Sequence, residues 1–259
     1  MGAKILLRRL LLLPYQLIVL FFFFLLMVFW GVGSCLASLF DASGNKAHRF
    51  LIYWAKSSLA LAGLRIKIEG LEYLDPKQTY IFMPNHASFL DILLAFAYIP
   101  CNFRIITKEE IFCIPLMGLA LKRSRQIPMD RDNPRKGLAS LRLASNLLQE
   151  GISIVVFPEG TRTRDGEIQD FKATLFILPI RSGVSVVPVR IDGTFDALRR
   201  GGILLNPVPL KIAFHQPMPV GTFKDRDRWL YAKKVQEVLA SFPSPTLTVS
   251  SLSEQSTKL

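Results

Sequence analysis

The feature that most constrains this chain is an uncharged stretch near its N-terminus, from Leu10 to Phe40. Its centre, Leu17–Phe29, holds only apolar side chains, which are favourable in a bilayer and unfavourable in water. As one straight helix the stretch would measure on the order of 45 Å, more than the roughly 30 Å of a hydrocarbon core. We therefore expect a membrane-embedded helical segment that tilts, bends or breaks, with the break at Gly31 and Gly33.

Other interpretations of this segment are a secretory signal or a lipoprotein signal. Basic residues precede the apolar run, and Val32–Cys35 is weakly similar to a lipoprotein cleavage site. The run is longer than the roughly 7–15 apolar residues of a signal peptide, which favours a retained anchor. Lys46, Arg49 and further basic residues follow it, so the positive-inside rule predicts that the large remaining part of the chain faces the cytoplasm.

The composition narrows the choice of partners. Lys and Arg number 32 against 20 Asp and Glu, a net charge of +12, which favours an anionic membrane or nucleic acid. The basic residues are dispersed and no recognition motif for nucleic acid is present, so the membrane is the better explanation. Cys35, Cys101 and Cys113 are too few and too far apart for a disulfide framework or a zinc cluster. We expect a reducing compartment and no metal site.

Three regions follow from the pattern along the chain. We expect membrane-anchoring and interfacial helices over 1–63, including an interfacial helix at Phe50–Leu64, then a folded domain over 64–242 and a polar, flexible tail over 243–259. In the domain, short apolar runs alternate with helical patterns, which predicts an α/β fold with a mixed, largely parallel central sheet flanked by helices. The expected strands are Leu64–Glu69, Tyr80–Met83, Phe103–Thr107, Gln126–Met129, Ile152–Phe157, Val184–Ile191 and Leu210–Phe214, and the main expected helices are Pro134–Glu150, Lys172–Ser182 and Asp225–Phe242.

His86 has the best surroundings for catalysis among the three histidines. It follows an apolar strand and precedes an apolar helix, at the edge where α/β proteins place ligands. If the helix begins after Ser88, Ser88 is the N-cap and Asp91 is its third residue, from which the carboxylate can reach the imidazole. A carboxylate paired with an imidazole makes a general base. The alternative is that Ser88 and Asp91 form only a capping box beside an incidental His86.

A second polar cluster follows the strand at Ile152–Phe157, in the turn Pro158–Gly166. Arg162, next to backbone amides at the end of a buried strand, is suited to capture a phosphate in a bidentate manner. Glu159 could orient that arginine or an acceptor group. The alternative is an ordinary loop with solvated charges.

These clusters resemble the glycerolipid acyltransferases, and most of all the 1-acylglycerol-3-phosphate acyltransferases. His86–Asp91 and Phe157–Arg162 are similar to the first and third motifs of the family, Ile127–Arg131 to the second and Val187–Val189 to the fourth. The resemblance runs from about Ile66 to Ile212 in the family's order and would make 64–242 the acyltransferase domain.

The resemblance implies a membrane enzyme that transfers a fatty acyl group from a thioester to lysophosphatidic acid, forming phosphatidic acid. His86 would be the base and Asp91 its partner. The implied acceptor site contains Arg131, Glu159, Gly160, Thr161 and Arg162. No cofactor is implied, and the co-substrate would be acyl-CoA or an acyl thioester of acyl carrier protein.

Two alternatives remain: another lysophospholipid or related lipid as the acceptor, or a non-catalytic membrane protein that binds lipid. Thr174 stands where relatives usually have glycine, which leaves the acceptor or acyl preference open.

Overall fold

A seven-stranded sheet forms the centre of the molecule, with strand order β1-β7-β6-β2-β5-β3-β4. The computed structural model describes residues 2–130, 133–202 and 204–241, and residues 2–12 and 134 by their backbone only. The predicted tail and Arg131 therefore lie outside the described residues. The strands are β1 (Ile66–Glu69), β2 (Ile81–Pro84), β3 (Phe103–Lys108), β4 (Ile127–Met129), β5 (Ser153–Val155), β6 (Val186–Asp192) and β7 (Leu210–Phe214).

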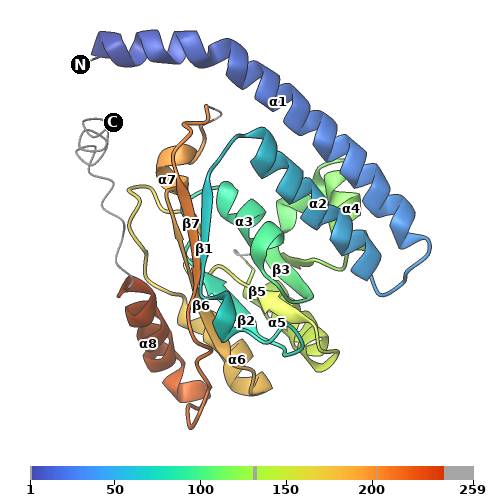
Figure 1. Ribbon diagram of the computed structural model, residues 1–259. Coiled ribbons are helices and arrows are strands. Elements are labelled where there is room, and N and C mark those ends of the chain that lie inside the picture. The colour runs from blue at the N-terminus through green and yellow to red at the C-terminus, as the bar shows by residue number, and fades with distance from the viewer. Residues whose placement is uncertain (1, 131–132, 203, 242–259) are drawn as a thin grey trace.

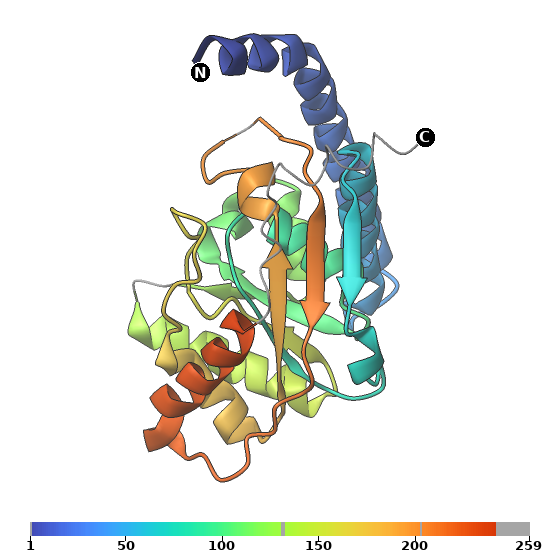
Figure 2. The same ribbon diagram turned by 60° about the vertical axis from the view of Figure 1, so that its left-hand side comes forward.

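All neighbouring strands are parallel except β6 and β7. Figure 2 shows β6 running opposite to β7 and β1. The mixed, largely parallel sheet predicted from the sequence is confirmed. The parallel direction of β6, β2, β5 and β3 brings their C-terminal ends to one edge, and the segments after these strands carry the candidate site.

Helices cover both faces of the sheet in separate layers (Figure 1). One core cluster packs α2, α3 and α4 against the sheet, and the other packs α5, α6 and α8 against its opposite face. The helices are α1 (Gly2–Ser38), α2 (Asn45–Leu61), α3 (Leu90–Tyr98), α4 (Met117–Arg123), α5 (Pro134–Gln149), α6 (Ile177–Ser182), α7 (Thr194–Ala197) and α8 (Arg228–Ala240).

Helix α1 is continuous, so the predicted break at Gly31 and Gly33 is wrong. Figures 1 and 2 show that α1 bends in its N-terminal half, which contains Pro14; proline interrupts the backbone hydrogen bonds of a helix and bends it. The two glycines allow close helix packing instead. A Cβ at Gly33 would lie 2.5 Å from the ring of Phe50, and one at Gly31 would lie 3.0 Å from Leu116 Cγ.

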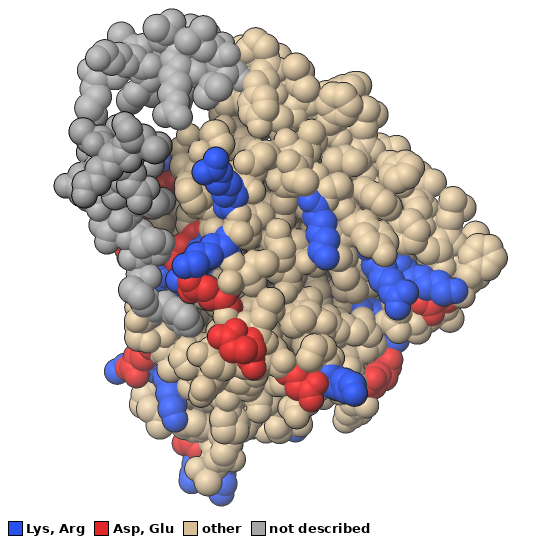
Figure 3. Space-filling view, viewed as in Figure 1, with Lys and Arg blue, Asp and Glu red and all other residues tan. Residues whose placement is uncertain are grey.

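The outer surface of α1 is apolar. Within Leu13–Ser38 the most apolar window has a mean hydropathy of 2.5 and is only 11% buried, which makes this helix long and apolar enough to cross a membrane. In Figure 3 the surface along α1, at the upper right, is tan. Helix α2 lies beneath it and contributes Leu51, Trp54 and Leu59 to the core, so the helix pair is packed onto the sheet domain.

A buried arginine ties the α1–α2 loop to the sheet. Arg104 on β3 is fully buried and donates hydrogen bonds to Phe103 O at 2.7 Å, Asn45 Oδ1 at 2.7 Å, Asn102 Oδ1 at 3.0 Å and Ser43 O at 3.3 Å. Burial lowers the pKa of its guanidinium to about 10, so it stays charged at neutral pH. All four acceptors are neutral groups.

We expect Arg104→Ala to lower the free energy of unfolding by about 3 kcal/mol, because it leaves a cavity and buried acceptors without donors. Thermal unfolding in detergent measures the loss. Arg181→Ala is the control, since its ion pair with Asp225 is exposed and worth about 1 kcal/mol at most. Equal losses in the two variants would contradict a structural role for Arg104.

Candidate active site

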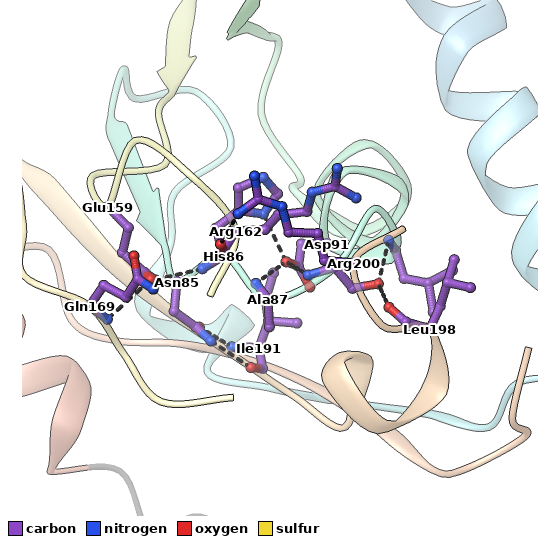
Figure 4. Close-up of polar contacts among 12 residues, drawn as sticks. Asn85, His86, Ala87, Asp91, Glu159, Arg162, Gln169, Ile191, Leu198 and Arg200 are labelled. Carbon is purple, nitrogen blue, oxygen red and sulfur yellow. Dashed lines mark hydrogen bonds and ion pairs between the residues drawn. The ribbon is translucent and has the colours of Figure 1, made fainter. Parts of the chain in front are cut away.

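The site begins at the turn between β2 and α3, which Asn85 fixes to the neighbouring strand. Asn85 Nδ2 donates to Ile191 O at 2.9 Å and Asn85 Oδ1 accepts from Ile191 N at 2.7 Å, so its side chain extends the β2–β6 pairing past the last strand residue. His86 follows directly and has its position fixed by that anchor (Figure 4).

The His86 and Asp91 side chains meet as predicted. Asp91 Oδ2 lies 2.9 Å from His86 Nδ1 and also accepts from the backbone N–H groups of Ala87 at 2.6 Å and Ser88 at 2.7 Å. The Asp91 residue is 0% exposed. Because an ionised carboxylate only accepts, the proton of a neutral imidazole lies on Nδ1, and Nε2 carries the free lone pair.

The sequence left open whether Asp91 is the partner of His86 or only part of a capping box with Ser88. In the structure its carboxylate makes both kinds of contact. Asp91 binds the imidazole and also satisfies N–H groups at the start of the helix, as in a capping box. The expected start was one residue early, because α3 begins at Leu90 with Phe89 in the N-cap position. Ser88 Oγ accepts from Leu90 N at 3.3 Å and donates to Leu198 O at 2.6 Å.

The Glu159 carboxylate binds the backbone of the turn that contains His86. Its Oε1 accepts from the backbone N–H of His86 at 2.7 Å, and its Oε2 accepts from Gln169 N at 3.1 Å. The residue is 3% exposed. Burial raises the pKa of this carboxyl to about 7, although the two N–H donors act in the opposite direction. The Glu159 carboxylate therefore binds the protein's own backbone and is not among the groups that line the cavity below.

The segment after β5 contacts both the ring and the backbone of His86. Phe157 stacks on the imidazole at 4.0 Å between ring centroids, and Thr163 N donates to His86 O at 2.9 Å. Gly160 has φ 72°, and a Cβ there would lie 2.7 Å from Lys172 Cε. A side chain at this position would be strained and would displace the lysine, so glycine brings the backbone and the Lys172 ammonium close together.

A cavity of about 480 Å³ lies in front of this turn. The structure brings together His86, Gly160, Thr161 and Arg162 from the predicted set in its lining. Three more cations line it that the sequence had not assigned to the site: Lys108, Lys172 and Arg200. Lys108 ends β3 at this edge of the sheet, a signal that could have found it, whereas Lys172 and Arg200 lie well beyond the ends of β5 and β6. An anion is the ligand that such a lining favours.

A second cavity, about 380 Å³, continues from the first and shares Thr107, Gly160 and Lys172 with it. Its other walls are mostly apolar and come from β4, α5 and the segment before α6, including Met129, Leu138 and Leu141. Thr174 lines this cavity, so the departure from the family's usual glycine lies on its wall.

The comparisons with known proteins agree with the motifs. Residues 65–192 match the model of the family described as Acyltransferase. These residues make up just under half of the chain and include all four motifs. The chain is 35% identical over 190 residues to a chloroplastic 1-acyl-sn-glycerol-3-phosphate acyltransferase of Arabidopsis thaliana, covering 72% of this chain and 53% of that one. It is 34% identical over 160 residues to a 1-acyl-sn-glycerol-3-phosphate acyltransferase of Borreliella burgdorferi, covering 62% of this chain and 64% of that one.

The fold also matches a solved structure. The crystal structure of the 1-acyl-sn-glycerophosphate (LPA) acyltransferase PlsC from Thermotoga maritima superposes with a TM-score of 0.75 at 26% identity, covering 90% of this chain and 93% of that chain. The chain spans about half the length of the Arabidopsis relative. The resemblance inferred from the motifs and the predicted fold are both confirmed.

The pKa of Glu159 yields a prediction about pH. Because its folded-state pKa of about 7 is raised above the ordinary 4.5, the stability linked to this group is full below about pH 4.5 and is lost as the pH rises through about 7. Glu159→Gln removes that titration, so we expect its melting temperature to fall less than that of the wild type between about pH 5 and pH 7. Gln also has only one acceptor oxygen, which lowers stability at every pH.

Thermal unfolding against pH measures both effects, with the exposed Glu237→Gln as control. Parallel curves for the wild type and Glu159→Gln would contradict the assignment of a raised pKa to this buried carboxyl.

Proposed function

We propose that this protein transfers a fatty acyl group from a thioester to the free hydroxyl of 1-acylglycerol-3-phosphate, forming phosphatidic acid. The observation that carries the proposal is the pair His86–Asp91, with Nδ1 held by a buried carboxylate, in the wall of a cavity lined by four cations. The base can take a proton from an alcohol, and the cations can hold a phosphate beside it. The names of the relatives support the same substrate.

The steps balance without a cofactor. His86 Nε2 takes the proton of the acceptor hydroxyl while its oxygen attacks the thioester carbonyl, and Asp91 stabilises the imidazolium. The new C–O bond forms first and gives a tetrahedral oxyanion, and its collapse breaks the C–S bond. The imidazolium then returns the proton to the leaving thiolate. Phe157, stacked on the ring, limits its rotation during the exchange.

The developing oxyanion needs donors. The Gly160 N–H is not available, because it donates to Phe157 O at 3.1 Å. The backbone N–H groups of Thr161 and Arg162 donate to no acceptor among the described residues, and both residues line the cavity. We assign the oxyanion donors to these two amides.

The thioester's acyl chain would occupy the apolar cavity of about 380 Å³ beside Gly160, because that cavity opens into the catalytic one and has mostly apolar walls. The proposed carrier of the acyl group is coenzyme A or acyl carrier protein. We further propose that α1 is embedded in the membrane and that the acyltransferase domain faces the cytoplasm, as the apolar surface of α1 and the basic chain that follows support.

The function test is an acyl-transfer assay of the wild type and His86→Ala with long-chain acyl-CoA, acyl carrier protein thioester and a panel of lysolipids. We expect lysophosphatidic acid to be the best acceptor and His86→Ala to lower kcat by roughly 10²–10⁴-fold, the usual contribution of base catalysis. His215 is a half-buried histidine that does not line the cavity, so His215→Ala is the control and should be unaffected.

The outcomes separate the alternatives. If the enzyme prefers another lysophospholipid, the proposed acceptor is wrong and the proposed acyl-transfer reaction stands. Lipid binding without transfer by the wild type would favour the non-catalytic protein, and full activity of folded His86→Ala would contradict the base assignment.

A further inference from the structure

A third cavity, about 420 Å³, lies on the membrane-helix side of the catalytic one. Its walls come from the bent half of α1 with Val19, Leu20 and Phe23, from the start of α3, and from the segment after α7, including Leu205. Phe89 and Arg162 line both this cavity and the catalytic one. The α1 cleft, as we call it, therefore adjoins the cavity that contains His86, on the side of α1.

Hydrogen bonds join the segment after α7, on one wall of the cleft, to α1 and to the turn that contains His86. Gln16 on α1 donates from Nε2 to Leu205 O at 3.2 Å, and Ser88 in the catalytic turn donates from Oγ to Leu198 O at 2.6 Å. Asn206 N donates to Ala197 O at 2.7 Å and closes the base of the segment. The segment after α7 thus joins the membrane helix to the catalytic turn.

Cations gather where the cleft meets the catalytic cavity. Arg162 and Arg199 line the cleft, and Arg200 lines the catalytic side. Arg200 Nη1 lies 3.4 Å from Arg162 O, and Figure 4 shows the two arginine side chains next to each other beside His86. In the part of the chain that the structure describes, neither forms an ion pair with a carboxylate. Both guanidinium groups remain available to an anionic ligand.

We propose that the α1 cleft binds the acyl chain already present on the acceptor, a single-chain lipid with a phosphomonoester headgroup, and that Arg200 binds the phosphate together with Arg162. This inference rests on the proposed function. The apolar cavity beside Gly160 and the α1 cleft both adjoin the polar cavity at His86. This arrangement matches a reaction between two molecules that each carry one acyl chain. The α1 cleft is the one walled by the membrane-directed helix, so a lipid lying beside α1 reaches His86 through it without its chain crossing water.

The placement of the acceptor can be tested without turnover. The probe is lysophosphatidic acid with a diazirine in its acyl chain, bound to full-length His86→Ala protein in detergent and photolysed. We expect crosslinks on peptides that contain Val19–Phe23 or Leu205. Crosslinks on peptides from the cavity beside Gly160, with Leu138, Leu141 or Thr174, would overturn the placement, and so would crosslinking that an excess of unlabelled lysophosphatidic acid does not reduce.

A matched pair of variants tests the same point by kinetics. Val19→Trp fills the cleft, whereas Ile18→Trp adds the same bulk at a 55% exposed position on α1 that does not line it. Only Val19→Trp should raise the KM for a long-chain acceptor, by about tenfold, the effect of about 1.4 kcal/mol, with the KM for a short-chain acceptor and for the thioester unchanged. A rise in the thioester KM alone would assign the cleft to the donor.

Arg200→Ala should raise the KM for lysophosphatidic acid by about tenfold, as expected for one lost charge-assisted contact, leave the KM for the thioester unchanged, and be partly rescued by Arg200→Lys. An unchanged acceptor KM would remove Arg200 from the phosphate site.

If the wild type transfers no acyl group but the crosslinks fall on α1, the proposed function fails and the binding site stands.

Discussion

The structure of the candidate site depends on one buried carboxylate. A single oxygen of Asp91 accepts from the imidazole and from two backbone N–H groups, all within 2.9 Å. Those contacts start α3, bend the chain after β2 and orient His86, so the geometry of the proposed base is set by the same group that begins the helix. The other oxygen, Oδ1, is buried and has no hydrogen-bond partner among the described residues, so the contacts to Oδ2 supply the stabilisation of this buried carboxylate.

The remaining parts of the site are held to that turn by contacts between distant segments. Glu159, from the turn after β5, accepts the His86 N–H, and Asn85 joins the turn to β6. The three strand ends are therefore connected to one another before any substrate binds. Preorganisation of this kind reduces the cost of orienting a hydroxyl and a carbonyl for attack. The helix pair α1–α2 packs on the sheet domain and gives it an apolar outer surface along α1. Arg104 anchors the loop between the two helices.

How much of this could be read from the sequence depends on the range of each interaction. All seven strands were predicted because apolar runs bounded by turns are local signals, and the His86–Asp91 pair because it spans five positions. The predicted break at Gly31 and Gly33 is wrong: the two glycines give close contact with Phe50 and Leu116, partners distant in the sequence that no local pattern reveals.

Residues whose role depends on remote partners were harder to assign from the sequence. Glu159 was predicted at the acceptor site, but its carboxylate binds backbone groups of its own chain, a contact between residues 73 positions apart. Lys172 and Arg200 lie well beyond the ends of β5 and β6, and no local pattern distinguishes them from solvated cations.

The central claim is that the negative charge of Asp91, held against Nδ1, makes His86 a base. Asp91→Asn is the most direct test, since it keeps the size of the side chain and an oxygen for the Ala87 and Ser88 N–H groups but removes the charge that stabilises the imidazolium. Steady-state kinetics of the folded variant should show kcat reduced roughly 10²–10⁴-fold with both KM values close to those of the wild type. A folded Asp91→Asn protein with kcat within a few-fold of the wild type would contradict the account.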